Sequence, residues 1–291
     1  KLLSVLPAHP DAKVTIRQFG LEKFHTLHTS GHITIETYLR ILALDTLPPD
    51  CEKIIYLDSD LVVVSALDDL WEIDLSGHAL AAVLDPYAED RPRALGMPRS
   101  ASYVNAGVLL INVKRWRERD LAARVLAYAE REGSRLLCHD QDAINAVLHE
   151  QILTLPFRWN CQARMFRKSD SLIGPNRAAV LAATGDPAII HYTTGRKPWM
   201  FTEFMPKRAL YRHYLAMTAW RDAPPARRSL FHLPEALFNG AAYALGSSQN
   251  FHLFLRTSKV GRVLARSERL VRRLGWNPRP RVLPPVGGSG R

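Results

Sequence analysis

The sequence predicts an α/β fold in which a sheet is flanked by helices and followed by a helical, basic C-terminal extension. Apolar runs of strand length recur along the first 200 residues, and segments with helical spacing of apolar residues separate them. The charge distribution sets the C-terminal part apart. Of the 39 Lys and Arg residues, ten lie beyond residue 250, where Glu268 is the one acidic residue, so the remainder of the chain is nearly neutral.

The stretch from Lys53 to Asp60 is the centre of this prediction. Its apolar residues 54–57 predict a buried, central strand of a parallel sheet. Side chains at i and i+2 of an extended chain point the same way, so Asp58 and Asp60 should face one site, with Ser59 turned away. Carboxylates at the C-terminal end of a strand suit Mg²⁺ or Mn²⁺. The motif alone also fits a strand cap that faces solvent.

The segment before this strand predicts an unusual opening for an α/β domain. The elements expected there are a helix-like patch at 2–6, a strand at 14–19, and a helix at 33–44 that ends before Pro48-Pro49. This order lacks the strand that usually opens a doubly wound domain. We therefore expect an N-terminally truncated domain spanning residues 1–222.

The elements expected after Asp60 alternate between the two types. Strands are predicted at residues 80–84, 108–111, 151–155 and 188–192. Helices are predicted at 67–71, 116–131 and 143–148, with a surface loop at 88–100. No repeat of fixed period is present.

The C-terminal extension, residues 223–291, begins near Pro224-Pro225 and ends in a linker-like Gly-Gly-Ser-Gly-Arg tail. Residues 260–274 place apolar side chains on one helical face and basic ones around it, which predicts an interfacial helix on an anionic membrane surface. A docking helix with solvated Arg side chains is the alternative. No recognition motif accompanies the charge, so no nucleic-acid partner is expected.

The cysteines and the hydropathy pattern indicate a compartment. Three cysteines without close spacing indicate neither a disulfide framework nor a zinc site. No apolar run approaches the ~20 residues that span a bilayer. We expect a cytoplasmic protein, peripheral on the inner face of the membrane.

Four polar clusters could converge on one site. They are Asp58 with Asp60, Asp85 with Asn105, Asp140-Gln141-Asp142, and residues 191–199. His191 follows an apolar strand and could be a third metal ligand, while Gly195 allows the backbone to approach a phosphate that Arg196 and Lys197 would neutralise. Each cluster alone also fits a duller explanation, such as a turn, a helix cap or a satisfied polar residue.

Taken in order, these motifs resemble glycosyltransferase family 8, which includes glycogenin and bacterial lipopolysaccharide galactosyl- and glucosyltransferases. The resemblance runs from about residue 15 to 210 and rests on residues 38–40, 53–63, 103–112, 140–142 and 191–199. It implies a GT-A-type (Rossmann-like) mixed sheet flanked by helices. It also implies retaining, Mn²⁺- or Mg²⁺-dependent transfer of galactose or glucose from a UDP-sugar to a saccharide or glycolipid acceptor such as lipopolysaccharide.

The resemblance also implies residue roles. Asp58, Asp60 and His191 would hold the metal, Gly195 and Lys197 the diphosphate, and Arg40, Asp85, Asn105, Asp140 and Asp142 the donor sugar. Gln141, with Asp140, would act near the anomeric carbon. Front-side departure and attack fits a Gln that stabilises developing charge, while Asp140 or Asp142 acting covalently is the rival mechanism.

Two other functions stay open at this stage. In a haloacid-dehalogenase-like phosphatase, Asp58 would be the nucleophile and Asp60 the acid/base. A catalytically silent fragment would bind only metal or membrane. Because the family opens with a strand and an acidic loop that bind uridine, residues 1–291 alone are expected to show weak or no turnover of UDP-sugars.

Overall fold

The computed structural model describes residues 11–18, 35–167, 174, 176–226 and 232–244. The described strands form two sheets. The four-stranded sheet has the order β1-β4-β3-β5, and the three-stranded sheet the order β2-β7-β6. The strands are β1 (Lys53–Leu57), β2 (Leu61–Val63), β3 (Leu80–Leu84), β4 (Val104–Asn112), β5 (Ile152–Leu155), β6 (Cys161–Gln162) and β7 (Ile189–His191).

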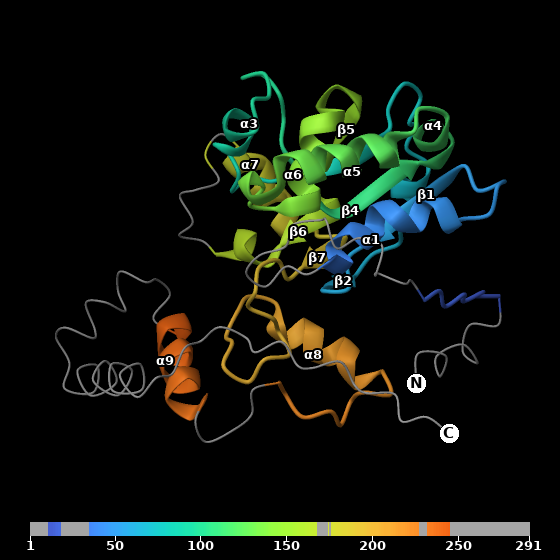
Figure 1. Cartoon of the computed structure of the whole chain (residues 1–291). Helices are drawn as coiled ribbons and strands as arrows, with labels where there is room; N and C mark the ends of the chain where they lie inside the picture. The colour runs from blue at the N-terminus through green and yellow to red at the C-terminus, as the bar shows by residue number, and fades with distance from the viewer. Residues whose placement is uncertain (1–10, 19–34, 168–173, 175, 227–231, 245–291) are drawn as a thin grey trace, which may run out of the picture.

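Helices cover the sheets and extend below them (Figure 1). The α-helices are α1 (Leu39–Leu42), α2 (Asp68–Trp71), α3 (Arg91–Ala94), α4 (Val113–Glu118), α5 (Leu121–Glu132), α6 (His139–Leu148), α7 (Arg177–Gly185), α8 (Arg208–Ala216) and α9 (Leu233–Ala244). Short 3₁₀ turns are η3 (Ile35–Tyr38), η4 (Ala43–Thr46), η5 (Gly133–Arg135), η6 (His149–Gln151), η7 (Phe157–Asn160) and η8 (Ala163–Phe166). The predicted α/β class with flanking helices is confirmed.

The four-stranded sheet is buried on both faces, which explains the continuous apolar runs of its inner strands. Leu80, Ala82 and Leu109 pack on one side with residues of α1, α5 and α6. Their neighbours Ala81 and Val108 pack on the other side with residues of α2, η7 and α7. Alternate residues of β3 and β4 therefore enter two separate cores.

The pairing of β1 corrects one prediction. Residues 53–57 do form a strand, but it pairs antiparallel with β4, with Lys53 opposite Asn112, and it lies at one edge of the four-stranded sheet. Its residues are half-buried. The prediction of a central strand in a parallel sheet was wrong; the sheet is mixed, with the parallel pair between β3 and β5.

Several element boundaries also differ from the predictions. The helix expected at 116–131 is divided into α4 and α5 at Asp120, which has a left-handed backbone (φ 49°). The loop expected at 88–100 contains α3, and residues 14–18 form no strand. The strand expected at 108–111 starts earlier, at Val104, so that Asn105 and Gly107 lie inside β4.

The remaining elements agree with the predictions to within a few residues. This holds for the strands expected at 80–84, 151–155 and 188–192 and for the helices expected at 33–44, 67–71 and 143–148. The helix-like patch at 2–6 and the basic helix at 260–274 lie outside the described residues. None of the described helices has the length and apolar composition needed to cross a bilayer.

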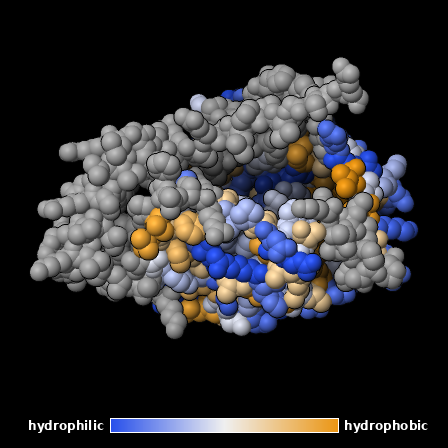
Figure 2. Space-filling view, turned by 90° about the horizontal axis from the view of Figure 1, so that it is seen from below, coloured by the Kyte–Doolittle hydropathy of each residue, from blue (hydrophilic) through white to orange (hydrophobic). Residues whose placement is uncertain are grey.

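The C-terminal helices α8 and α9 lie on one side of the sheets (Figure 1). Asn239 of α9 donates a hydrogen bond to the Thr202 carbonyl at 2.8 Å, which ties this helix to the segment after β7. Seen from that side, the described surface carries mostly hydrophilic side chains with smaller hydrophobic patches among them (Figure 2).

Arg117 of α4 holds the segment that leads into β1. Its guanidinium donates hydrogen bonds of 3.0–3.2 Å to the carbonyl oxygens of Leu47, Pro48, Pro49 and Cys51. A planar guanidinium with five N–H donors can bind several carbonyl oxygens that converge on one place. Arg117 thereby fixes the path of the chain toward the carboxylates that follow β1.

We expect Arg117→Lys to lower the free energy of unfolding by about 1–3 kcal/mol, because a single ammonium cannot satisfy four carbonyls in this arrangement. Urea denaturation measures the change. Arg119→Lys, at an exposed neighbouring position, is the matched control and should leave stability unchanged. Equal stability of the two variants would show that the carbonyl contacts of Arg117 contribute nothing.

Candidate functional site

Asp58, Asp60 and His191 meet where the two sheets adjoin. Asp58 follows β1, and its backbone N–H donates to the Gly107 carbonyl at 2.9 Å. His191 ends β7, which pairs antiparallel with β2 so that His191 lies opposite Leu61, the residue after Asp60. One ligand atom from each of the three side chains lies within 4.8 Å of the others. Ser59 is exposed, as the i and i+2 spacing predicts.

The geometry of these three side chains fits a divalent cation. His191 Nε2 lies 3.1 Å from Asp60 Oδ1 and 3.7 Å from Asp58 Oδ2. Two carboxylates and one imidazole nitrogen form a donor set that Mn²⁺ accepts and that Mg²⁺ accepts less well, because imidazole is a softer ligand. His191 is only 3% exposed, so its ring is fixed by packing.

Gly107 makes this approach possible. A Cβ atom at position 107 would lie 2.0 Å from His191 Cε1 and 2.6 Å from His191 Nδ1, which are contacts that a side-chain carbon does not make. Sequence reasoning missed this residue, because the strand was expected to begin only after it, at residue 108. A glycine within an apolar strand is itself the signal that could have revealed it, since such glycines mark close approach of other groups to the backbone.

Lys197 contacts the same cluster. Its ammonium pairs with Asp60 and donates to the Tyr192 carbonyl at 2.9 Å. Burial raises the pKa of Asp60, but its contact with His191 and the charge of Lys197 together hold that pKa well below its ordinary value. Asp60 is therefore ionised throughout the neutral range. Gly195 lies in the exposed segment between Tyr192 and Lys197, in which Thr194 has a left-handed backbone (φ 76°).

Arg40 links Asp58 to Asp140. Its guanidinium lies 3.1 Å from Asp58 Oδ1 and 2.6 Å from Asp140 Oδ2, and it donates to the Ala106 carbonyl. Burial would lower the pKa of Arg40, but Asp140 and Asp58 raise it above its ordinary value. Burial raises the pKa of Asp140, and Arg40 and the Thr37 hydroxyl oppose that rise.

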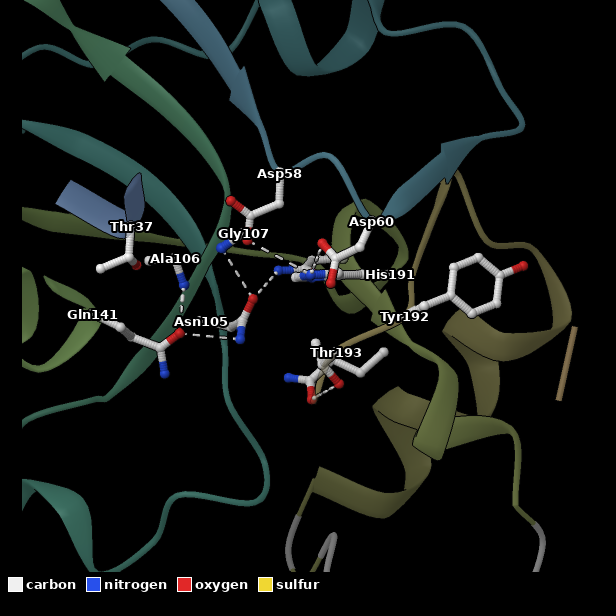
Figure 3. Close-up of polar contacts among 12 residues, drawn as sticks. Thr37, Asp58, Asp60, Asn105, Ala106, Gly107, Gln141, His191, Tyr192 and Thr193 are labelled. Carbon is white, nitrogen blue, oxygen red and sulfur yellow. Dashed lines mark hydrogen bonds and ion pairs between the residues drawn. The ribbon is translucent and has the colours of Figure 1, made fainter. Parts of the chain in front are cut away.

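The amide of Gln141 faces the same region from the first turn of α6 (Figure 3). Its Oε1 accepts from Asn105 Nδ2 at 3.1 Å and from the Ala106 N–H at 3.0 Å. Its Nε2 donates to Tyr103 Oη at 3.2 Å and lies 3.5 Å from Asp85 Oδ2. The structure thus brings Gln141, Asn105 and Asp85 together.

Asp142 has a different environment from the other predicted residues. It is fully buried, and its carboxylate pairs with Arg91 and accepts from Tyr103 Oη at 2.6 Å and from the Cys138 N–H at 2.9 Å. These contacts join α6 to α3 and to the start of β4. They support the position of Gln141 rather than presenting Asp142 to a ligand.

A cavity of about 430 Å³ lies apart from the acidic cluster. Its walls come from the segment after Lys197, from α8 and from residues 220–226, with Trp199, Tyr211 and Trp220 as the aromatic side chains and Arg208 and Arg212 as the basic ones. None of the residues predicted for the site lines it.

Comparison with known proteins gives concordant results. The family model described as "Glycosyl transferase family 8" matches residues 2–203. General stress protein A of Bacillus subtilis (strain 168) is 32% identical over 197 residues, which cover 66% of this chain and 68% of that protein. The lipopolysaccharide 1,2-glucosyltransferase of Escherichia coli (strain K12) is 25% identical over 216 residues, 73% of this chain and 63% of that protein.

Among solved structures, the galactosyltransferase LgtC in complex with donor and acceptor sugar analogues is similar to this chain. The two superpose with a TM-score of 0.58 and 27% sequence identity, covering 68% of this chain and 83% of that chain.

Gly107→Ala should displace the His191 ring and lower the free energy of unfolding by about 1–3 kcal/mol, the usual cost of overpacking a filled interior. Removing the ring should relieve the clash, so Gly107→Ala should cost much less in a His191→Ala background. Thermal or urea unfolding of the four proteins gives this double-mutant cycle.

Gly185→Ala serves as the control for the glycine replacement, because a Cβ there meets nothing within 4 Å. Additive effects of Gly107→Ala and His191→Ala would contradict the proposed close approach.

Proposed function

Because the chain belongs to glycosyltransferase family 8 and has the GT-A fold, we propose that it transfers galactose or glucose, with retention, from a UDP-sugar to a saccharide or lipopolysaccharide acceptor. The family match across residues 2–203 overturns the phosphatase alternative. The convergence of Asp58, Asp60 and His191 beside Lys197 carries the proposal. We assign the catalytic domain to residues 1–222 and the C-terminal extension to residues 223–291.

In this proposal, Asp58, Asp60 and His191 hold Mn²⁺, or less favourably Mg²⁺. A bound cation of this kind supplies positive charge to a diphosphate leaving group. Lys197 lies at the Asp60 carboxylate, close enough to add a second positive charge to the same group. Gly195, in the exposed turn two residues before Lys197, lets the backbone approach the phosphates.

The donor sugar would be held by Arg40, Asp85, Asn105 and Asp140. Arg40 fits this role because it contacts both Asp140 and Asp58, one of the proposed metal ligands. It therefore lies between the proposed sugar subsite and the proposed diphosphate subsite. Asp85 and Asn105 lie within hydrogen-bonding reach of Gln141. Asp142, with its carboxylate fully engaged by Arg91, Tyr103 and Cys138, acts through these neighbours.

The contacts of Gln141 favour front-side transfer over a covalent intermediate. Two donors, Asn105 Nδ2 and the Ala106 N–H, occupy its carbonyl oxygen, so that oxygen is a poor nucleophile. An amide held this way can stabilise positive charge that develops at the anomeric carbon. The carboxylate oxygens of Asp140 are likewise already engaged, by Arg40 and by the Thr37 hydroxyl.

The named relatives support the choice of sugar and acceptor. One is a lipopolysaccharide 1,2-glucosyltransferase and one structural neighbour is a galactosyltransferase. Glucose and galactose differ only in the orientation of one hydroxyl group. One or two contacts in the pocket therefore decide which of them is used.

We expect Asp58→Asn to abolish Mn²⁺-dependent binding of UDP, together with the weak UDP-sugar hydrolysis expected of residues 1–291, because a first ligand contributes more than the outer residues that orient it. Calorimetry with UDP and Mn²⁺ measures binding, and released UDP from UDP-glucose and UDP-galactose measures turnover. Asp69→Asn, at an exposed carboxylate of α2, is the control.

Two outcomes would reject this proposal. One is UDP binding that needs no divalent cation or survives Asp58→Asn unchanged. The other is a wild-type chain that binds neither Mn²⁺ nor UDP, as expected of a silent fragment.

The charge of residues 251–291 carries a second proposal, that the protein is cytoplasmic and that the extension holds it on an anionic membrane surface. Sedimentation with anionic phosphatidylglycerol vesicles should remove the chain from solution, and neutral phosphatidylcholine vesicles should not. Deletion of residues 255–291 should abolish the difference. Equal binding of the full and the shortened chain would refute this role.

A further inference from the structure

Asn160 is a buried residue between the metal cluster and Gln141. It is the last residue of η7, is 0% exposed, and was not singled out by its sequence pattern. Its Oδ1 lies 2.9 Å from His191 Nδ1, and its Nδ2 lies 2.8 Å from Asn105 Oδ1. One amide therefore touches both halves of the site.

Backbone N–H groups fix the direction of these hydrogen bonds. The Gly107 N–H donates to Asn105 Oδ1 at 3.1 Å, and the Ala106 N–H donates to Gln141 Oε1 at 3.0 Å (Figure 3). A backbone N–H can only donate, so both side-chain atoms must be oxygens. Asn160 must then present its NH₂ to Asn105 and its carbonyl oxygen to His191.

This polarity determines the tautomer of His191. Because Asn160 Oδ1 can only accept, His191 Nδ1 must carry a proton. In the neutral ring, the lone pair then lies on Nε2, which is 3.1 Å from Asp60 and 3.7 Å from Asp58. Because these carboxylates only accept hydrogen bonds, they favour a second proton on the ring while no cation is bound. An imidazole that binds a metal needs one nitrogen that donates to an outer partner and another whose lone pair is available to the metal.

We propose that Asn160 is a positioning residue that holds His191 in the Nδ1–H tautomer and, through Asn105, holds Gln141. The identity of the cation and the role of Gln141 rest on the proposed function. The tautomer does not, because it follows from hydrogen bonds within the chain. The backbone around Asn160 is fixed by pairing of β6 with β7, in which Cys161 lies opposite Ile190.

Two substitutions at Asn160 separate the two contacts. Asn160→Leu keeps the branched shape of the side chain, with methyl groups in place of the amide oxygen and nitrogen, and removes both hydrogen bonds. Asn160→Asp keeps an acceptor for His191 Nδ1–H but presents a carboxylate oxygen to Asn105 Oδ1, where a donor is needed. Asn112→Ala is the control, since Asn112 caps α4 at the opposite end of β4.

The test combines nitrogen NMR of the metal-free chain at alkaline pH, where the His191 ring is neutral, with Mn²⁺ titration and UDP-sugar hydrolysis. In ¹⁵N-histidine protein, long-range ¹⁵N–¹H correlations report the tautomer of His191, identified by its loss in His191→Ala. We expect Nδ1–H in the wild type, in Asn160→Asp and in Asn112→Ala, and loss of this preference in Asn160→Leu.

The Mn²⁺ dissociation constant should rise about 10–100-fold in Asn160→Leu and stay within about threefold of wild type in Asn160→Asp. Turnover should fall in both variants at Asn160, at least ~10-fold in Asn160→Asp, because the contact from Asn105 to Gln141 is disturbed.

Nε2–H in the wild type, or an unchanged tautomer and Mn²⁺ affinity in Asn160→Leu, would overturn the inference. The wild-type tautomer decides it even where Asn160→Leu fails to fold. A wild type with the Nδ1–H tautomer but without Mn²⁺ binding would reject the proposed function and leave the tautomer assignment standing.

Discussion

The contact between the His191 ring and the backbone of Gly107 is the constraint on which the site depends. It is the place where β7 of the three-stranded sheet reaches β4 of the four-stranded sheet, and a single methyl group at position 107 would separate them. The Asp58 N–H donates a hydrogen bond to the carbonyl of the same glycine, and β2, which follows Asp60, pairs with β7. The carboxylates of Asp58 and Asp60 are therefore positioned by strands that this contact holds together. The geometry of the proposed metal site is thus a property of sheet packing rather than of a flexible loop.

Charge balance explains how so many carboxylates are tolerated in one place. Asp58, Asp60 and Asp140 converge in a region where burial disfavours the charged forms, and Arg40 and Lys197 supply the compensating charge. A buried charge with its partner removed is strongly destabilising, so these cations have a structural task besides any contact with substrate. In the proposed function, the same arrangement suits an anionic leaving group, because Lys197 lies beside the Asp60 carboxylate that would hold a cation.

The sequence was sufficient for the parts of the structure that local pattern determines. The apolar run of β3 and the alternation of Asp58 and Asp60 follow directly from chain geometry, and His191 was recognisable because it follows a short apolar strand. The antiparallel pairing of β1 with β4 could not be predicted from local sequence patterns, because non-local packing determines which strands pair. Asn160 was also missed, since a 3₁₀ turn has no periodic signal, and its importance comes from residues 55 and 31 positions away.

The most direct test of the central claim is to detect nitrogen coordination in the Mn²⁺ complex. Electron spin-echo envelope modulation of the wild-type chain with one equivalent of Mn²⁺ reports coupling between the ion and a ligating imidazole nitrogen. The account predicts one such coupling, which His191→Ala removes and Asp69→Asn leaves intact. Mn²⁺ bound without a nitrogen coupling, or with a coupling that persists in His191→Ala, would show that Asp58, Asp60 and His191 do not form the metal site.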